Sequence, residues 1–274
     1  MDNFLTKEKF LLPAAIGLSL IAVIFWLVTS SQPLIDQHEF RQTQTAITSL
    51  YLDPSLKGLL NYETPVLGSP WSIPFEFPLY QLIVHALSGI SPLSLDSSGR
   101  LTSSFFGLLC VVPAYGLMRL FQIKKVGRYW FLILYFSSPI YLYWNRTFMI
   151  ESLALFLSLS SLYYYFKIRI SSAFESRNSL HFIRYLLFFC TLLFSLLTKV
   201  TTSAPVFLII SVDVFFNILL AFQLIRCSDT RLFKLPRFSK SELAVLLSIL
   251  ILVFVVLKAW LIHADYLKSL NLIG

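Results

Sequence analysis

The richest set of chemically active side chains lies between residues 36 and 46, directly after the first long apolar segment. Asp36, His38, Glu39, Arg41 and Gln42 stand there within a few positions of one another. A carboxylate in a partly dry pocket beside cations is suited to accept a proton from a hydroxyl or an amine. Nearby cations stabilise a phosphate leaving group, and a guanidinium presents a planar fork to phosphate oxygens. These residue types favour transfer chemistry that uses a general base and a phosphate.

Two simpler interpretations of the same stretch stay open. Asp36 and Glu39 have the spacing of a helix capping box, with Asp36 as the N-cap residue of an amphipathic helix over residues 36–52. Arg41 on such a helix at the membrane surface can contact lipid head groups. Capping alone does not require the imidazole and the amides beside it, so the density of polar neighbours favours a site.

Isolated polar residues also mark the ends of later apolar segments. They are Arg100, Arg146, Glu151 and Lys199, with Thr201, His263 and Asp265 in similar positions. Charges near a membrane are costly and usually face a protein interior or a water-filled cavity. We therefore expect these side chains to converge with Asp36 on one cavity. The alternatives are a local ion pair between Arg146 and Glu151, and a Lys199 side chain that extends to the membrane surface.

Asp213 differs from these residues because it lies in the middle of an apolar segment. An intramembrane carboxylate is a functional candidate, but we favour a hydrogen-bonded or protonated structural aspartate. Cys110, Cys190 and Cys227 form no motif, and the chain has no zinc-ligand spacing and no P-loop. We predict no metal site and no cofactor, with a divalent metal left open.

The composition indicates which elements must position these side chains. The chain is 57% hydrophobic and 13% charged, whereas soluble domains average about 25% charged residues. Apolar runs of about 18 residues or more are long enough to cross a bilayer as helices. We predict an all-α polytopic membrane protein with seven transmembrane helices, over Leu11–Thr29, Leu101–Phe121, Tyr129–Trp144, Ile150–Phe166, Phe182–Leu197, Thr202–Ile225 and Leu243–Ile262.

The segment from residue 30 to residue 99 differs in character from the rest. Its prolines exclude one continuous helix, and its apolar piece Leu79–Leu87 is too short to span a membrane. We predict a large outer loop with amphipathic or interfacial helices, which carries the site. Residues 100–262 hold helices two to seven, and residues 1–274 form a single domain.

The distribution of positive charge predicts the orientation. Lysine and arginine concentrate in cytoplasmic loops, and most of them lie on the side of the chain that holds the N-terminus. That side carries Lys7, Lys9, Arg119, Lys124, Lys125, Arg128, Lys167, Arg169, Arg177, Arg184, Arg226, Arg231, Lys234, Arg237 and Lys240. The other side carries Arg41, Lys57, Arg100, Arg146, Lys199, Lys258 and Lys268. The N-terminus is thus predicted to be cytoplasmic and the loop over 30–99 to face outward, and the net charge of +8 needs no nucleic acid to explain it.

The motifs resemble, in order, those of GT-C glycosyltransferases, in particular the branch of protein mannosyltransferases and aminoarabinose transferases. The pattern D-x-H-x-x-R-Q-x-x-T-A of bacterial members reads here as Asp36, His38, Arg41, Gln42, Thr45 and Ala46. Four further segments are similar to landmarks of the family: Glu76–Tyr80, Gly99–Leu101, Arg146–Glu151 and Leu197–Lys199. Two features depart from the family. Ile150 stands where the family often has proline, and relatives usually continue beyond the seventh helix.

The resemblance implies a function and a role for each candidate residue. Its members are integral-membrane enzymes that transfer a sugar from a polyprenyl-phosphate donor. It implies that Asp36 is the catalytic general base of an inverting transfer on the outer face of a bacterial-type plasma (inner) membrane. It implies sugar and acceptor contacts for His38, Glu39, Arg41 and Gln42, donor-phosphate contacts for Arg100, Arg146 and Lys199, and sugar contacts or site support for Glu76 and Glu151. The implied partners are the lipid-linked sugar, membrane lipids and an acceptor that is a lipid, a polysaccharide or a protein.

Two other classes of function stay open. A non-catalytic or truncated GT-C-like protein that serves as an assembly partner would tolerate substitution of Asp36. A lipid or solute transporter would use the same outward cavity together with Asp213, and it would show internal hydropathy repeats, which the sequence does not show.

Overall fold

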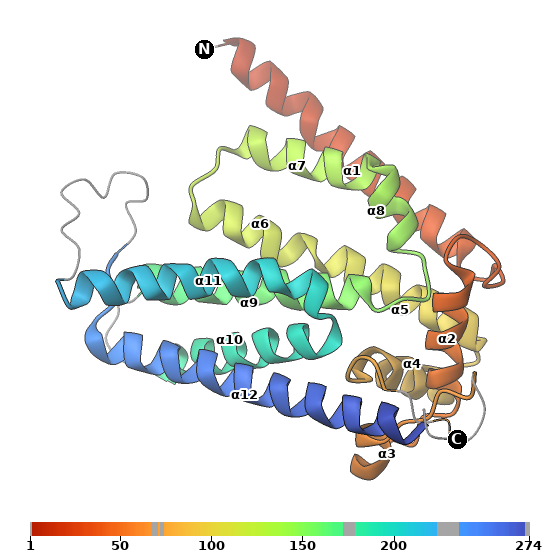
Figure 1. The fold of residues 1–274 in the computed structure, drawn as a ribbon. Coiled ribbons are helices and arrows are strands. Elements are labelled where there is room, and N and C mark those ends of the chain that lie inside the picture. Colours follow the sequence, from red (N-terminus) through yellow and green to blue (C-terminus); the bar gives the residue numbers. More distant parts are fainter. Residues whose placement is uncertain (1, 67–70, 72–73, 172–178, 224–235, 272–274) are drawn as a thin grey trace.

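The computed structural model describes residues 2–66, 71, 74–171, 179–223 and 236–271, and every regular element there is a helix. The helices are α1 (Asp2–Thr29), α2 (Glu39–Leu50), α3 (Leu56–Leu60), α4 (Leu79–Ile90), α5 (Leu95–Leu109), α6 (Val111–Leu120), α7 (Lys125–Ser137), α8 (Pro139–Trp144), α9 (Glu151–Ser171), α10 (Ser179–Thr198), α11 (Val200–Ala221) and α12 (Lys240–Asn271). The long helices lie roughly side by side, and α2, α3 and α4 gather at one end of them (Figure 1).

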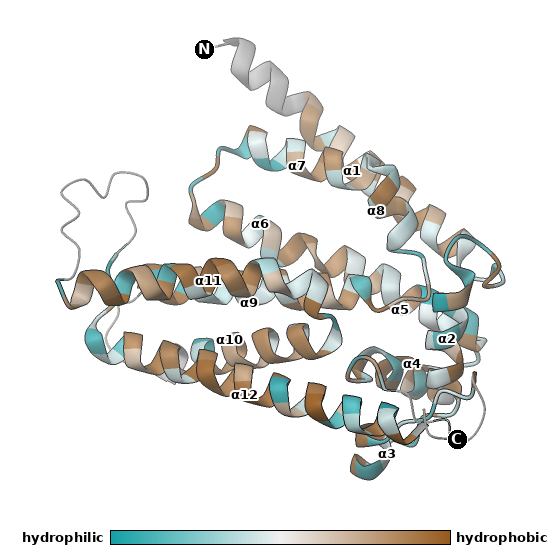
Figure 2. Cartoon of the chain, in the orientation of Figure 1, coloured by the Kyte–Doolittle hydropathy of each residue, from teal (hydrophilic) through white to brown (hydrophobic). Residues whose placement is uncertain are grey.

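Within the described residues, five helical segments are long and apolar enough to cross a membrane. They are Phe10–Thr29, Leu95–Leu120, His181–Thr198, Val200–Ala221 and Lys240–Leu270. Hydrophobic residues cover much of α11 and the first half of α12, whereas hydrophilic residues gather around α2 and α3 (Figure 2). This arrangement is consistent with the predicted α-helical polytopic membrane protein. The third and fourth predicted spans correspond to α7–α8 and α9, which are not among these five segments.

Helix α9 occupies the centre of the molecule. It packs against α5, α6, α10 and α11, and its Ser152, Ser158 and Ser161 are buried between neighbours. Small side chains allow the backbones of membrane helices to approach closely. Its interior position accounts for a composition that is richer in serine and tyrosine than in branched apolar residues.

The second predicted span begins earlier than the sequence indicated. Helix α5 starts at Leu95 because the Ser94 hydroxyl accepts a hydrogen bond from the Ser97 backbone N–H at 3.2 Å, which caps the first turn. Arg100 therefore lies inside α5 and not at its start. This shift matters for the site because it places the Arg100 side chain between helices, where it is fully buried.

Two other elements follow from local sequence. Pro139 divides the predicted third span into α7 and α8, because proline disrupts a helix interior but is tolerated in the first turn, where α8 places it. Helix α12 continues to Asn271, well beyond Ile262. Its added turns contact the predicted outer loop, where His263 Nε2 lies 3.0 Å from the carbonyl oxygen of Leu60.

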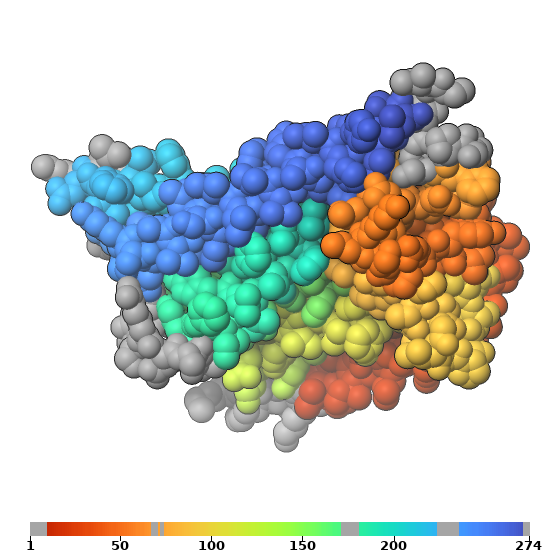
Figure 3. Space-filling model, turned by 90° about the horizontal axis from the view of Figure 1, so that it is seen from below, coloured from red at the N-terminus to blue at the C-terminus, as the bar shows by residue number. Residues whose placement is uncertain are grey.

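The predicted outer loop packs against the ends of the long helices and does not extend away from them. Ala46 and Tyr80 join one hydrophobic cluster with Phe148, and Tyr62 joins another with Trp260 of α12. Viewed from below, residues near 50–65 press against the last turns of α12 (Figure 3). Helix α4 has 12 residues, which confirms that this apolar piece is too short to span a membrane.

We predict that Gly99→Ala lowers the free energy of unfolding by about 1–3 kcal/mol, the usual cost of an overpacked core. An added Cβ at residue 99 would lie 2.1 Å from the ring of Phe148, so α5 and the turn before α9 would have to separate. Thermal unfolding of the purified protein in detergent measures the change.

Gly89→Ala in α4 is the matched control, because a Cβ there would meet no atom within 4 Å. That variant should be neutral or more stable by up to about 1 kcal/mol. Equal melting temperatures for the two variants would contradict the proposed contact.

Candidate functional site

Asp36 lies at the meeting point of three segments that are far apart in the sequence. Its carboxylate forms ion pairs with Arg100 of α5 at 3.2 Å and with Arg146, in the turn before α9, at 3.0 Å. The side-chain amide nitrogen of Gln42 donates a hydrogen bond to the same carboxylate at 2.6 Å. We call Asp36, Gln42, Arg100 and Arg146 the Asp36 cluster. Two of the predicted donor-phosphate residues thus surround the predicted base.

The capping-box interpretation of Asp36 is wrong. Helix α2 begins at Glu39, its N-cap residue is His38, and no side chain caps it. His38 adopts a left-handed backbone conformation with φ of 66°, which turns the chain sharply just before the helix. Asp36 consequently lies ahead of α2, and its carboxylate faces the arginines instead of the N–H groups of the helix.

Arg100 is fully buried, as Gln42 is, with none of its side chain exposed. It donates hydrogen bonds to both Asp36 carboxylate oxygens, to the carbonyl oxygen of Arg146 at 3.0 Å and to that of Pro33 at 3.0 Å. An isolated buried charge is unfavourable unless it is paired and hydrogen-bonded. The single guanidinium therefore holds the turn after α1 and the turn before α9 against α5.

Gln42 joins the two halves of the cluster. Its amide oxygen accepts a hydrogen bond from the backbone N–H of Phe148 at 2.9 Å, while its amide nitrogen binds Asp36. Arg146 is less buried than Arg100 and also donates to Gln32 at 3.0 Å. Its guanidinium lies over the ring of Tyr143, 5.3 Å from the ring centroid. The exposed side of the cluster thus consists of Arg146 and part of Asp36.

A second pair of predicted residues meets on the other side of α2. Arg41 forms an ion pair with Glu76 at 3.1 Å, and both side chains line a polar recess together with Thr45, Thr48, Thr64 and Gln81. The recess has a volume of about 10 Å³, which is room for one water molecule. The buried side-chain oxygen of Gln81 has no hydrogen-bond partner among the described residues.

Lys199 forms an ion pair with Glu151 at the start of α9. Glu151 and Arg146 therefore do not form the local ion pair that their spacing suggested. The alternative in which the Lys199 side chain extends to the membrane surface is also wrong, because this side chain pairs with Glu151. The segment 76–80 reaches the same place, because the N–H of Phe77 donates to the carbonyl oxygen of Leu197 at 2.9 Å. The second carboxylate oxygen of Glu151 is buried and without a partner among the described residues.

Several predicted residues lie outside these contacts. Glu39 is exposed on α2 and forms no hydrogen bond or ion pair within the described part of the chain. His38 is exposed and lies against Trp144, 5.1 Å between ring centroids. Asp265 pairs with Lys268 at 3.5 Å, and His263 contacts α3. We predicted that all the charged residues at the helix ends converge on Asp36. Arg100 and Arg146 do so, whereas Lys199 pairs with Glu151 instead.

Asp213 is a hydrogen-bonded aspartate, as we favoured from the sequence. Its carboxylate accepts hydrogen bonds from Tyr165 and Arg169 of α9. The sequence placed Arg169 in a cytoplasmic loop, but α9 continues to Ser171 and carries it inward. Of the residues named for orientation and for cysteine chemistry, Arg177, Arg226, Cys227, Arg231 and Lys234 lie outside the described residues.

Sequence reasoning did not assign a supporting role to two residues that hold the site together. Tyr80 is fully buried and donates to the carbonyl oxygen of Gly99 at 2.7 Å. Asn145 is buried, and its carbonyl oxygen accepts from Ser104 at 2.9 Å. Tyr80 ended the family-like segment Glu76–Tyr80, which was the available signal, whereas Asn145 directly precedes Arg146 and showed none.

The pKa of Asp36 is lowered from its ordinary value of 3.8. Partial burial acts to raise the pKa, but the hydrogen bonds from Gln42 and Arg100 and the charges of Arg100 and Arg146 together outweigh it. The carboxylate is therefore ionised at neutral pH, as a general base must be, while the two arginines weaken its affinity for a proton.

No group of three or more histidine, cysteine, aspartate or glutamate side chains suited to a metal ion occurs among the residues that the structure describes. Comparison of the chain with protein-family models, with curated proteins and with solved structures found no match.

We predict that Asp36→Asn lowers the free energy of unfolding by about 3 kcal/mol. Removing one partner of a buried ion pair leaves the other charge uncompensated, at a cost of about 3–5 kcal/mol, and the lower end applies because the Asp36 side chain is 22% exposed. Thermal unfolding in detergent measures it. Asp53→Asn is the same exchange at an exposed carboxylate that accepts hydrogen bonds, among the described residues, only from the nearby Ser55, so it should change the stability by about 1 kcal/mol or less.

The stability that Asp36 contributes should also depend on pH. A carboxyl group whose pKa is lowered by folding stabilises the protein above its unfolded value, near 3.8, and loses this contribution as the pH falls through the lower folded value. The difference in melting temperature between the wild type and Asp36→Asn should thus be constant near neutral pH and should shrink below about pH 4. A difference that persists unchanged to about pH 2 would show that Asp36 is not paired as described.

Proposed function

We propose that the protein is a membrane glycosyltransferase of the GT-C type, which transfers a sugar from a polyprenyl-phosphate donor with Asp36 as general base. The observation that carries the proposal is the Asp36 cluster, in which an ionised, partly exposed carboxylate lies between Arg100 and Arg146. The proposal includes seven spans, with α7–α8 and α9 as the third and fourth, a cytoplasmic N-terminus and a site on the outer face of a plasma membrane.

The proposed reaction uses each part of the cluster. Asp36 takes the proton from an acceptor hydroxyl or amine, whose oxygen or nitrogen attacks the anomeric carbon of the sugar from the face opposite the phosphate. The bond between that carbon and the phosphate oxygen breaks, its electron pair leaves with the polyprenyl phosphate, and the configuration inverts. The guanidinium of Arg146 stabilises the phosphate that is released.

The exposure of the two arginines suggests an order of events. Arg146 is 13% exposed, whereas Arg100 is fully buried and held by backbone carbonyls. A donor phosphate therefore meets Arg146 first and competes with Asp36 for it. When Arg146 turns to the phosphate, Asp36 loses one of the charges that lower its pKa, and its affinity for the acceptor proton rises. Donor binding thereby activates the base.

The polar recess beside α2 supports a sugar-binding role for its residues. Among the recess residues, Gln81 has a buried side-chain oxygen without a partner in the described part of the chain, an acceptor that a sugar hydroxyl can satisfy. Arg41 and Glu76 form the wall of the recess. Because the recess holds only about one water molecule, the sugar ring lies at its mouth and directs hydroxyl groups inward. We assign Lys199 to the support of Glu151.

We predict that Asp36→Asn lowers sugar transfer by about 10²–10⁴-fold, the usual contribution of a general base, while the donor still binds. Removal of the carboxylate leaves Arg146 free for the donor phosphate, so affinity for the donor should be kept or increased. The measurement is transfer of a labelled sugar from polyprenyl phosphate by purified protein below its melting temperature, with donor binding measured separately.

The matched control is Asp53→Asn, which should transfer sugar as the wild type does. Loss of donor binding together with transfer in Asp36→Asn would assign Asp36 a purely structural role, as in a non-catalytic assembly partner. Full transfer by that variant would remove the mechanism.

A further inference from the structure

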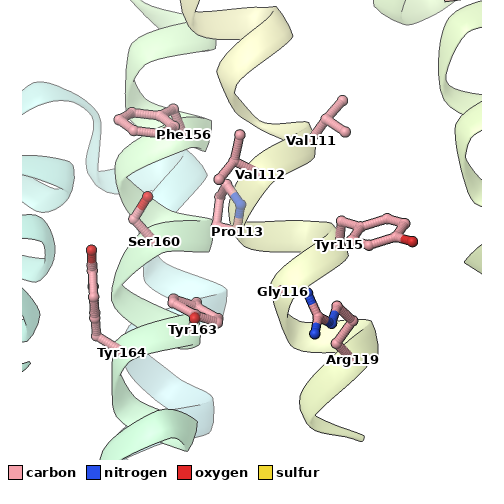
Figure 4. Close-up of a pocket in the computed structure, with 10 residues that line it drawn as sticks. All are labelled: Val111, Val112, Pro113, Tyr115, Gly116, Arg119, Phe156, Ser160, Tyr163 and Tyr164. Atoms are coloured by element: carbon pink, nitrogen blue, oxygen red, sulfur yellow. The ribbon is translucent and has the colours of Figure 1, made fainter. Parts of the chain in front are cut away.

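A groove lies between α6 and α9, away from the Asp36 cluster. It has a volume of about 510 Å³, within the range of about 300–1,000 Å³ of small-molecule sites. Its upper part is apolar, with Val111, Val112 and Phe156, and its lower part holds Ser160, Tyr163 and Arg119. The side chains of Arg119 and Tyr163 come from the two facing helices in the lower half of the view (Figure 4). The groove is therefore amphipathic along its length.

The position of the groove along the membrane follows from helix geometry. Arg119 lies nineteen positions after Arg100 on the continuous span Leu95–Leu120, which is roughly 28 Å at 1.5 Å per residue. The hydrocarbon core of a bilayer is about 30 Å thick. Arg119 thus lies at the membrane face opposite the Asp36 cluster, and the apolar part of the groove, near Val111, lies close to mid-membrane.

Arg119 has a different electrostatic setting from the arginines of the Asp36 cluster. Its side chain is exposed and forms no hydrogen bond or ion pair with any described residue. The neighbouring charges are also positive. Lys167 Nζ donates to the hydroxyl of Tyr163 at 3.1 Å, and Arg128 lies over the ring of Tyr115, 5.0 Å from its centroid.

The helices around the groove supply no acidic residue near Arg119 that would neutralise its positive charge. No aspartate or glutamate occurs in α6 or α7, and the acidic residue of α9, Glu151, lies at the opposite end of that helix and pairs with Lys199. The end of the groove thus has several cations, and its anion must come from outside these helices.

Gly116 shapes the lower part of the groove. An added Cβ at this position would lie 2.7 Å from the ring of Tyr163, so the absence of a side chain lets the tyrosine ring approach α6. The hydroxyl of Tyr163 in turn holds Lys167 near the groove. Arg119 thus lines the groove directly, and Lys167 lies next to it through its hydrogen bond to Tyr163, which also lines the groove.

We propose that this groove binds one anionic phospholipid of the leaflet opposite the Asp36 cluster, with its phosphate at Arg119 and Lys167 and an acyl chain along Val112 and Phe156. Basic pockets between membrane helices bind anionic head groups in this way. The tail of a polyprenyl donor fits the observations less well, because its charge would lie at the Asp36 cluster and would leave the cations of the groove unpaired. The groove is formed by α6 and α9, its position along the membrane follows from the span that α5 and α6 form, and the inference is independent of glycosyl transfer.

The test is native mass spectrometry of the purified full chain in detergent, titrated with dioleoyl phosphatidylglycerol or dioleoyl phosphatidylcholine. The wild type should retain one phosphatidylglycerol in preference to phosphatidylcholine. Arg119→Gln should weaken phosphatidylglycerol binding about five-fold, the effect of one basic side chain near an anionic lipid, and should leave phosphatidylcholine unchanged. Arg119→Lys should retain most of the preference.

Two further variants separate the groove from general surface charge. Lys240→Gln removes an exposed cation at the start of α12, outside the groove, and should keep wild-type binding. Val112→Trp fills the apolar part from an exposed position and should reduce retention of both lipids while the melting temperature stays unchanged.

Three results would overturn the proposal. Equal retention of the two lipids by the wild type would exclude an anionic site. An equal loss of binding in Lys240→Gln and Arg119→Gln would indicate diffuse attraction to a basic surface. Competition by a polyprenyl phosphate whose own binding is insensitive to Arg119→Gln would assign the groove to the tail of the donor lipid.

Discussion

The fold around the site depends on one constraint, which is that the buried guanidinium of Arg100 must be neutralised and hydrogen-bonded. A charge that is fully removed from water is strongly unfavourable without partners. Arg100 finds them on two segments that α5 does not adjoin in sequence, at Pro33 and Asp36 after α1 and at the carbonyl of Arg146 before α9. The need to satisfy one side chain thus fixes where the predicted outer loop meets the helices.

In the proposed mechanism, the same interaction sets stability against chemistry. The arginines that keep Asp36 ionised also lower its affinity for a proton. The ion pairs that stabilise the cluster therefore make Asp36 a weaker base. Functional sites commonly retain such unfavourable compromises. Burial distinguishes the two arginines: Arg100 is enclosed, whereas Arg146 is partly exposed, and in the proposed mechanism Arg146 exchanges Asp36 for the donor phosphate.

The sequence predicted the helical class, because the length and hydropathy of the apolar segments indicate helices. It also predicted that Asp36 meets Arg100 and Arg146, because charged side chains near a membrane are costly and usually pair with one another. It did not predict which charges pair. Spacing suggested that Glu151 pairs with Arg146 and that Asp36 caps α2, yet the left-handed backbone at His38 and the approach of α10 to α9 decide otherwise. Such choices depend on tertiary packing, which local patterns do not encode.

The positive charges near the two ends of the span Leu95–Leu120 differ in their pairing, although the sequence counted them together as a topology signal. At one end Arg100 and Arg146 share a carboxylate from the same chain. At the other end Arg119 lies beside an amphipathic groove with no anion from the described residues, and α6 and α7 contain no acidic residue. A cation that is paired within the protein stabilises the fold, whereas Arg119, which has no partner among the described residues, is the cation that the proposed lipid would bind. Pairing among the described residues, and not the count of charges, distinguishes the two ends.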